Sequence, residues 1–567
     1  MRKTKAKIMA EKRKKAIVRK EKAITLIALI VTIIVLLILA GVTIATLTGE
    51  NGILTKAQDA KNKTEQAEKD EKTNLSRTED IINQYVNGIE VEQVTDTNPG
   101  VLETEGTDAY VINSIEDLVV FASNVTNGTT YEGQTVKLGL SLDFNSTKSY
   151  VDPLRTDYGE YGYDGELKTL LTSGEGFRPI GTESYLEAEI TKVNTFKGTF
   201  DGDNNVIYGL YINREITYVG EEYEEYSMGL FGYNEGTIQN LGIANNSINV
   251  EKISGNCNVF AGGIVGRNNG TIDNCYNKGN IITNFITGGI AGRNNETIQN
   301  CYNSGKICGS SRISGIAAEG GEFINCYNLG DISSYNALTE IHIGGISTDS
   351  NSISRCYNSG NIVATSTGIV FACGIGFAEV IYNCYNTGDV IAIVNEYNDW
   401  KYATAAGICA YYGKTINNCY NTGNILSNSN SQYSRASGIA DGCNVTNCYN
   451  LGTVKAIGSE NTVIQCGGIA ARKEAGDVII TNSYNTGKIE YEGGKSISLG
   501  AILGLGGTIT NCSYLAGTAE KGMGTGTDVT TRIDNIEDMP DVLTILGSEF
   551  KKDTNDINNG YPIFTWQ

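Results

Sequence analysis

The chain of 567 residues contains one histidine, and this scarcity limits the chemistry that it can carry out. His342 lies in Glu340-Ile341-His342-Ile343-Gly344, where it alternates with apolar residues, so we expect an outward-facing histidine on a β-strand. The His-Glu-x-x-His motif of zinc peptidases is absent from the sequence, and so is any Cys-x-x-Cys pair. A Ser-His-Asp or Cys-His arrangement would depend on His342 alone, without a nucleophile motif. The sequence therefore predicts no catalytic triad, no metal site and no cofactor.

The chain also lacks a positively charged body and a helical repeat pattern. Its net charge is −20, and because residues 1–22 carry eleven Lys or Arg and two Glu, residues 23–567 have a net charge of −29. Nucleic acid is excluded as a partner of so acidic a body, because the phosphates would be repelled. The sequence has 68 glycines, and its repeats show no apolar period of 3.6 residues, which excludes a helical solenoid.

What the second half does contain is a phrase of the type Asn-Cys-Tyr-Asn that recurs about every 25 to 35 residues. Its second position holds a cysteine or a substitute for it in ten copies: Leu241, Cys275, Cys301, Cys326, Cys356, Cys384, Cys419, Cys448, Ser483 and Cys512. Two residues before the first Asn of each copy stands a large apolar residue: Ile238, Ile272, Ile298, Phe323, Ile353, Ile381, Ile416, Val445, Ile480 and Ile509. The residue between is mostly polar, as a strand with one buried face requires.

Strict alternation would bury the first Asn of the phrase and expose the cysteine, although cysteine, leucine and serine suit an interior position better. The conflict disappears if this Asn adopts the left-handed conformation, which Asn tolerates better than most residues. The chain would then turn a corner, with Cys pointing inward and Tyr outward. Identical residues in register would let Asn side chains hydrogen-bond from coil to coil and let Tyr rings stack. We therefore predict an all-β fold, a parallel β-helix or β-solenoid.

The glycine-rich strand starts before these phrases resemble a known repeat. Gly229-Leu230-Phe231-Gly232, Gly263-Ile264-Val265-Gly266 and Gly289-Ile290-Ala291-Gly292 look like the GLUG repeats of bacterial surface proteins, and the resemblance covers about residues 108–515. It implies a repeat protein displayed on the cell surface. Some GLUG arrays are attached to IgA-specific metallopeptidases, but this chain lacks their zinc motif, so the resemblance does not imply that activity.

Fourteen cysteines lie between residues 257 and 512. One interpretation is a set of stacked, buried thiols that act as small apolar side chains. The other is that some form disulfides, because like positions in adjacent coils come within bonding distance and exported chains are often disulfide-bonded.

The N-terminus predicts a membrane anchor. The basic residues 1–22 precede a run from Ala23 to Leu47 that has no charge and is long enough to span a bilayer. Because basic flanks stay in the cytoplasm, we expect a single-pass protein of the cell membrane with a cytoplasmic N-terminus and an extracellular C-terminal domain. A cleaved secretory signal is the alternative, although the run is long for a signal core and has no small-x-small exit site.

Within this run, Ala23-Ile24-Thr25-Leu26-Ile27-Ala28 resembles the cleavage segment of type IV prepilins. The resemblance implies cleavage between Ala23 and Ile24 and a prepilin peptidase as a partner. Ala28 stands where prepilins carry the glutamate that pairs with a neighbouring subunit during assembly, so this contact is missing.

Composition divides the chain into six parts. We expect a basic cytoplasmic leader (1–22), a prepilin-like transmembrane α-helix (23–48), a helical stalk and linker (49–100), an N-terminal cap with the first coils (101–225), the GLUG-like solenoid (226–516) and a C-terminal cap (517–567). A helix beginning at Ser114 would cover the first open end, and residues 149–175 read as an inserted loop. At the other end, a helix over 540–546 that stops at Gly547 and a strand over 560–566 would form the second cap.

Clustered carboxylates are the catalytic groups of β-helical enzymes that cleave polysaccharides, and the sequence has two such clusters. Asp201 and Asp203 occupy a Gly-Asp-Asn turn, which explains them, and the run 221–225 reads as a solvated loop. Neither supplies an acid, a base and a nucleophile together, so we predict a chain that is not an enzyme.

Two functions remain. The first is an adhesin-like surface protein that binds glycan or a host or matrix protein through an outward column of Tyr276, Tyr302, Tyr327, Tyr357, Tyr385, Tyr420 and Tyr449. Those rings could stack on sugars, or they could simply stabilise the coil stack. The second is a structural role, as an envelope spacer or as a pilus-like or pseudopilus-like assembly subunit processed by a prepilin peptidase.

Overall fold

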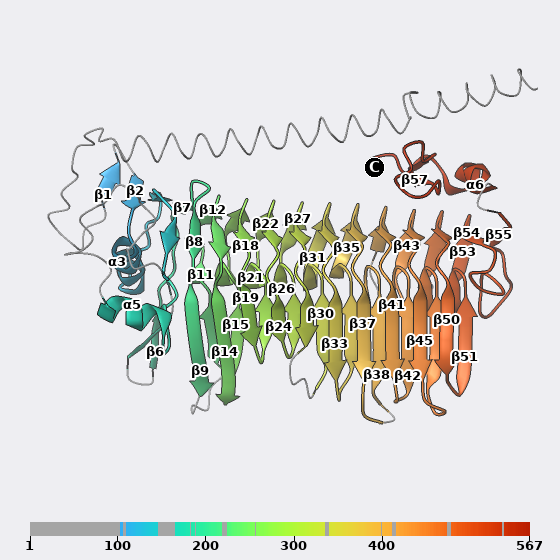
Figure 1. Ribbon diagram of the computed structural model, residues 1–567, viewed down its shortest axis with the longest axis horizontal. Coiled ribbons are helices and arrows are strands. Elements are labelled where there is room, and N and C mark those ends of the chain that lie inside the picture. Colours follow the sequence, from blue (N-terminus) through green and yellow to red (C-terminus); the bar gives the residue numbers. More distant parts are fainter. Residues whose placement is uncertain are drawn as a thin grey trace, which may run out of the picture. The chain divides into compact units, whose positions relative to one another are not determined.

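The computed structural model shows a parallel β-solenoid (Figure 1). It describes residues 103–105, 109–145, 165–181, 183–186, 189–217, 224–255, 257–334, 339–397, 400–410, 415–472, 478–535 and 538–567. The predicted leader (1–22), transmembrane helix (23–48), stalk and linker (49–100) and cleavage position at Ala23 and Ile24 lie outside these residues. Among the described residues, no helix combines the length and the apolar character needed to cross a bilayer.

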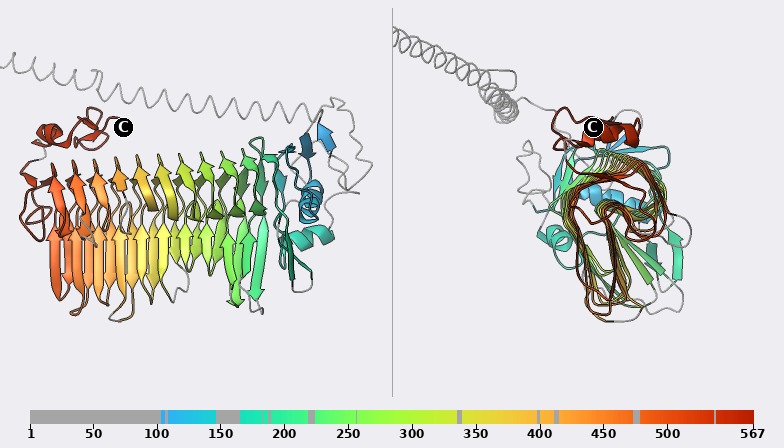
Figure 2. Two further views of the ribbon diagram at one scale, coloured as in Figure 1. Left: turned by 180° about the vertical axis from the view of Figure 1, so that it is seen from behind. Right: turned by 90° about the vertical axis from the view of Figure 1, so that its right-hand side faces the viewer.

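One coil consists of short strands joined by corners, and each strand pairs with its counterpart in the next coil. A representative coil contains β16 (Val265–Asn268), β17 (Thr271–Asp273), β18 (Tyr276–Asn277), β19 (Asn280–Thr283) and β20 (Ile286–Gly288). Viewed along the axis, the coils superpose closely (Figure 2). The counterparts pair in parallel and in register, as Ile298 with Phe323 and Tyr302 with Tyr327 do.

Two of the resulting sheets position the candidate sites. The threonine sheet has 14 strands: β1 (Glu103–Glu105), β2 (Ala109–Ile112), β3 (Thr135–Leu138), β7 (Thr199–Asp201), β12 (Thr237–Gln239), β17, β22 (Thr297–Gln299), β27 (Glu322–Ile324), β31 (Ser347–Ser354), β35 (Gly376–Tyr382), β39 (Thr415–Asn417), β43 (Asn444–Thr446), β48 (Ile479–Thr481) and β53 (Thr508–Thr510). The tyrosine sheet has 13 strands: β4 (Leu142–Asp143), β8 (Val206–Tyr208), β13 (Gly242–Ala244), β18, β23 (Tyr302–Asn303), β28 (Tyr327–Asn328), β32 (Tyr357–Asn358), β36 (Tyr385–Asn386), β40 (Tyr420–Asn421), β44 (Tyr449–Asn450), β49 (Tyr484–Asn485), β54 (Ser513–Leu515) and β55 (Thr531–Ile533).

Two further sheets of 10 strands complete the long walls of the solenoid. One runs from β9 (Tyr211–Thr217) and β14 (Ser247–Ser254) to β50 (Ile489–Gly493), and the other from β10 (Glu224–Met228) and β15 (Cys257–Ala261) to β51 (Ser496–Gly500). A sheet of four strands, β11 (Phe231–Asn234), β16, β21 (Ala291–Asn294) and β26 (Ala317–Glu319), closes the early coils.

The predicted corner is present in all ten copies. The first residue of the phrase has a φ between 48° and 55° in Asn240, Asn274, Asn300, Asn325, Arg355, Asn383, Asn418, Asn447, Asn482 and Asn511. After this left-handed residue the chain points the next side chain inward, and every cysteine of the column, together with Leu241 and Ser483, is at most 1% exposed. The apolar column before the corner is at most 6% exposed, so both columns form the core that the sequence predicts.

A ladder of asparagine amides runs inside the tyrosine sheet. It consists of the second Asn of the phrase, in Asn277, Asn303, Asn328, Asn358, Asn386, Asn421, Asn450 and Asn485, all 0% exposed. Each Nδ2 from Asn277 to Asn450 donates to the Oδ1 of the next coil at 2.7–2.8 Å. Each of the eight Nδ2 atoms also donates to the carbonyl of the glycine two residues later at 2.7–2.9 Å. The coil-to-coil bonds expected from the sequence are therefore present and buried.

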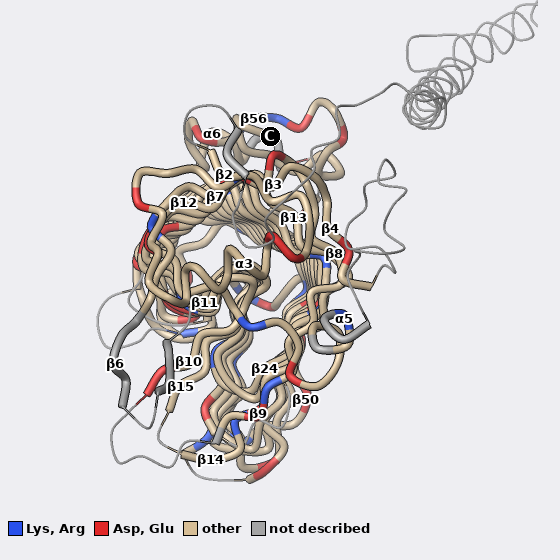
Figure 3. Tube along the Cα trace, turned by 90° about the vertical axis from the view of Figure 1, so that its left-hand side faces the viewer, with Lys and Arg blue, Asp and Glu red and all other residues tan. Residues whose placement is uncertain are grey.

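The N-terminal cap is a helix, as predicted. Ser114 precedes α3 (Ile115–Thr126), and its Oγ accepts a hydrogen bond from the backbone N–H of Asp117 at 3.0 Å. Phe121 is fully buried against the rings of Phe196, Phe200 and Phe231. The helix lies across the open end of the first coils (Figure 3), and its Leu118, Phe121 and Val125 are fully buried in the core there.

The segment predicted as an inserted loop over 149–175 requires a correction. Its last part forms the helix α5 (Gly165–Thr172), in which Leu171 is 5% exposed and belongs to the main core. Burial of the apolar side chain of Leu171 stabilises this helix against the coils. Residues 146–164 lie outside the described residues.

The C-terminal segment, residues 538–567, lies in a different location from the one that the sequence predicts. It forms α6 (Met539–Leu546), which ends at Gly547 as expected, and an antiparallel pair of β56 (Phe550–Lys551) and β57 (Ile563–Phe564). The predicted strand over 560–566 is thus only two residues long. The segment folds back over the tyrosine sheet (Figures 1 and 2) and packs there instead of covering the last coil, because its apolar side chains find partners in the tyrosine rings.

Candidate functional site

The tyrosine column proposed as a binding surface is a continuous stack of rings. From Tyr276 to Tyr484, neighbouring ring centroids lie 4.8–5.0 Å apart and the interplanar angles are 1–17°. The in-register pairing of the tyrosine sheet causes this geometry, because it places one ring directly above the next at the strand spacing.

This stacking leaves no open ring face for a sugar. Each interior ring has a neighbouring ring on both sides, and the first ring, Tyr276, lies against Gly242, where a Cβ would come within 2.3 Å of the ring. Lys278 places its Nζ 4.7 Å from the same ring centroid. Solvent therefore meets ring edges and hydroxyl groups. Of the two roles considered for the column, this geometry supports stabilisation of the coil stack.

The hydroxyl groups of Tyr357, Tyr420, Tyr449 and Tyr484 stay uncharged at neutral pH. Burial, together with the neighbouring phenols of Tyr385 and Tyr327, raises the pKa of Tyr357 to about 12. Burial also raises the pKa of Tyr420, Tyr449 and Tyr484. These four hydroxyl groups are therefore neutral hydrogen-bonding groups.

The C-terminal segment covers the far end of the column. Phe564 lies 5.2 Å from Tyr449 and Trp566 lies 6.3 Å from Tyr420, measured between ring centroids. Tyr449 is 1% exposed, so this predicted surface residue is not on an open surface, whereas the other six predicted tyrosines are half-buried. The open part of the column is Tyr276, Tyr302, Tyr327, Tyr357 and Tyr385.

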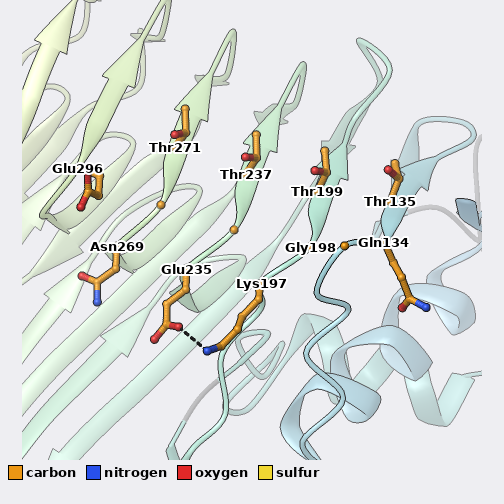
Figure 4. Close-up of a pocket in the computed structure, with 13 residues that line it drawn as sticks. Gln134, Thr135, Lys197, Gly198, Thr199, Glu235, Thr237, Asn269, Thr271 and Glu296 are labelled. Carbon is orange, nitrogen blue, oxygen red and sulfur yellow. Dashed lines mark ion pairs between the residues drawn. The ribbon is translucent and has the colours of Figure 1, made fainter. Parts of the chain in front are cut away.

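A groove on the outer face of the threonine sheet is the second candidate, and the sequence reasoning missed it. Thr135, Thr199, Thr237 and Thr271 form a row in successive strands (Figure 4), and the cavity along them has a volume of about 480 Å³. Within the part of the chain that the structure describes, none of these four hydroxyls has a hydrogen-bond partner. The signal in the sequence is Gly-Thr followed by an apolar residue in three successive coils, at Gly198, Gly236 and Gly270.

The glycines form the floor of this groove because the coils approach closely there. A Cβ on Gly236 would lie 2.1 Å from the carbonyl oxygen of Gly198, and one on Gly270 would lie 1.9 Å from that of Gly236. The rim is polar. Lys197 pairs with Glu235 at 3.0 Å, while Gln134, Asn269 and Glu296 add amide and carboxylate groups. The groove can thus hydrogen-bond to a polar ligand that extends along the solenoid axis.

The cysteine column has the geometry of buried thiols. All fourteen cysteines are free, and all but Cys308 are buried. In a typical step, the Sγ of Cys384 donates to the carbonyl of Tyr382 at 3.3 Å and accepts from the backbone N–H of Cys356 at 3.4 Å. Burial raises the pKa of Cys356, Cys384 and Cys419, so these groups stay protonated. Of the two interpretations, the structure shows stacked thiols; among the described residues no cluster of His, Cys, Asp or Glu is suited to a metal.

We expect one fast-reacting thiol when the native protein is titrated with a disulfide reagent such as DTNB. Cys308 is the partly exposed cysteine, whereas the other thirteen are buried and must wait for local opening. Cys308→Ser should abolish the fast phase, and Cys384→Ser should leave it unchanged. A burst of several equivalents in the native protein would contradict the buried column.

The other candidates from the sequence make structural contacts. The half-buried His342 faces away from the buried Ile341 and Ile343, as expected, and its Nε2 lies 2.7 Å from the carboxylate of Glu340. Burial would raise the pKa of Asp201, but hydrogen bonds from Asn240, from the backbone of Asp203 and from Gln239 outweigh it and lower the pKa.

Glu224 and Glu225 are the described residues of the acidic run 221–225. Glu224 accepts a hydrogen bond from the hydroxyl of Tyr226, and Glu225 pairs with Arg267 and Arg293. These partners account for both carboxylates.

Comparison with known proteins supports the repeat assignment. A model of the GLUG motif matches residues 261–282, which run from the end of β15 to β19 and so cover one coil. A crystal structure named "putative immunoglobulin A1 protease" from Bacteroides ovatus aligns with 16% identity over 81% of this chain and 93% of that chain, with a TM-score of 0.23. That score carries no argument about function. No curated protein matches the chain.

Proposed function

We propose that this chain is a non-catalytic, adhesin-like surface protein that binds a neutral glycan in the groove of the threonine sheet. The observation that carries the proposal is the row of four threonine hydroxyls without protein partners in a groove of about 480 Å³. The uncharged run from Ala23 to Leu47 would anchor the protein in the cell membrane with the coils outside, and the GLUG motif supports a surface location.

The chemistry of the groove favours a polyhydroxylated ligand. A hydroxyl group both donates and accepts hydrogen bonds, so a row of threonines at the coil spacing can pair with successive hydroxyls of an extended polymer. The only lysine of the groove lining is already paired with Glu235, and Glu296 adds a further negative charge. An acidic polysaccharide would find no free cation there, which is why we propose a neutral glycan.

The test is glycan binding by the full chain and by Thr237→Val. Valine keeps the shape of threonine and removes the hydroxyl, so we expect affinity to fall about 2- to 12-fold, the equivalent of one hydrogen bond of about 0.5–1.5 kcal/mol. Thr415→Val is the matched control, because Thr415 occupies the same column of the sheet outside the groove. A glycan array followed by calorimetry would make the measurement.

Two outcomes would count against this function. If Thr237→Val and Thr415→Val bind a glycan equally well, the groove is not the site. If the full chain binds none of a broad glycan panel, the structural role as an envelope spacer or pilus-like subunit becomes the better proposal.

A further inference from the structure

The C-terminal segment occupies a defined register of the tyrosine column. It covers three successive coils, those of Tyr420, Tyr449 and Tyr484, and its Phe550 and Phe564 pack on these rings. The hydroxyl of Tyr449 is 3.1 Å from Oε1 of Gln567, and that of Tyr484 donates to the carbonyl of Pro562 at 2.5 Å. Leu451, in the middle coil, packs against the same apolar cluster.

The same set of side chains recurs in the open part of the column. Two residues after each covered tyrosine stand Thr422, Leu451 and Thr486, and two residues after Tyr302, Tyr327 and Tyr357 stand Ser304, Leu329 and Ser359. The covered register (Tyr420, Tyr449 and Tyr484) and the open register (Tyr302, Tyr327 and Tyr357) therefore both have a hydroxyl, a leucine and a hydroxyl at this position, in that order. The other open coils carry Lys278 and Thr387 at this position.

The two registers also match in geometry but differ in exposure. The ring centroids of the open register are 4.9 and 4.8 Å apart, and those of the covered register are 4.9 and 5.0 Å apart. Leu451 lies at the interface with the C-terminal segment, whereas Leu329 is 43% exposed. The open register thus presents the same apolar contact without the segment that covers it.

The charge of the open register also suits the C-terminal segment. The C-terminal segment carries five acidic residues and two lysines, a net charge of −3. In the covered register, Asn418 is 3.5 Å from Glu549 and Asn482 lies beside Gly547. The open register has Asn300 in the place of Asn418, so the contact with Glu549 can be repeated there. In the place of Asn482 it has the exposed Arg355, which adds a positive charge to the surface that would receive a segment of net charge −3.

We propose that the register of Tyr302, Tyr327, Tyr357 and Leu329 is the docking site for the C-terminal segment of a second copy of this chain. The segment leaves its own column and packs on the equivalent rings of the neighbour. The contact joins two different surfaces, so it can continue from copy to copy along the cell surface. Because the segment is tethered near its own register, it stays on its own column in dilute solution. Docking on a second copy increases with concentration.

Sedimentation velocity of the full chain in mild detergent, over a range of concentrations, tests the proposal. We expect the average mass of the wild type to rise with concentration and Leu329→Asp to weaken this association at least tenfold. Leu329 and the control position Ile282 are both exposed, so neither substitution should affect folding. Ile282→Asp is the matched control, because Ile282 is 44% exposed on β19, in another sheet, and it should associate like the wild type. The proposal would be overturned if the wild type stays monomeric, or if Leu329→Asp associates as strongly as the wild type.

A second measurement identifies the segment. An equal mixture of ¹⁵N-labelled and unlabelled full chain is treated with an amine-reactive cross-linker and digested. We expect mixed-label peptides that join Lys551 or Lys552 of one copy to Lys306 of the other copy. Lys306 is exposed and follows Tyr302 of the open register by four residues. Cross-links from these lysines that are confined to one copy would overturn the exchange. Neither result depends on glycan binding, so this proposal and the proposed function can fail separately.

Discussion

Gly360→Ala is expected to lower the free energy of unfolding by about 3 kcal/mol or more, because overpacking against a rigid partner cannot be relieved by a side-chain movement. The Cβ of the new alanine would lie 2.0 Å from the carbonyl oxygen of Gly330 and 2.6 Å from its carbonyl carbon. Both atoms belong to the backbone of the preceding coil. Any shift of Gly330 would press on Gly305, which has the same close contact with Gly279, so the strain spreads along the stack.

Urea unfolding followed by circular dichroism would measure this effect. Ser359→Ala is the control, because Ser359 is the exposed neighbour of Gly360 and should change stability by less than about 0.5 kcal/mol. Equal midpoints for the two variants would show that adjacent coils do not approach as closely as the structure has them.

Asn358→Ala is expected to cost about 3–5 kcal/mol of stability, since it removes three buried hydrogen bonds at about 1–3 kcal/mol each before relaxation. The Nδ2 of Asn358 donates to the carbonyl of Gly360 and to Oδ1 of Asn386, both at 2.8 Å. Its Oδ1 accepts from Nδ2 of Asn328 at 2.8 Å. Asn249→Ala, at an exposed position with one side-chain bond to Asn213, should change stability by less than about 0.5 kcal/mol.

Asn358→Asp adds a dependence on pH that identifies the ladder. Burial without a cation raises the pKa of the introduced carboxyl in the folded state above the ordinary value of about 3.9. The variant should therefore be most stable below about pH 4, and it should lose stability as the pH rises through the raised pKa, because the unfolded state releases its proton first. Unfolding curves at pH 4 and pH 7 would show it. The absence of any difference between them, relative to the wild type, would mean that position 358 is accessible to water.

The corners and columns could be predicted from the sequence because their causes are local. An Asn in the left-handed region is identified by the conflict between strict alternation and the inward cysteine, and that conflict involves only three neighbouring residues. Local signals also predicted the two helices. Ser114 stabilises the first turn of α3, and α6 ends at Gly547. The N-terminal predictions for residues 1–100, including the anchor and the cleavage at Ala23, stay predictions.

The candidate groove was missed for a physical reason. Each Gly-Thr pair is unremarkable within its own coil, and a groove exists only because four threonines from strands β3, β7, β12 and β17 come into line. The aromatic column was predicted correctly as a stack, yet its consequence for binding was not. A ring that stacks on both neighbours has used the faces that a sugar would need, and only the measured spacing of 4.8–5.0 Å shows this.

The sequence by itself determined that this chain is a parallel solenoid with inward cysteines, left-handed corners and ladders of like residues, because a repeat brings the same residue to the same place in every coil. Only the tertiary structure decided where the C-terminal segment lies and which tyrosines stay open. Tyr484 and Pro562 are 78 positions apart in the chain, and Tyr449 and Gln567 are 118 apart. No local pattern specifies such contacts, because several coils of the column offer the segment similar rings, and packing together with the length of the tether selects among them.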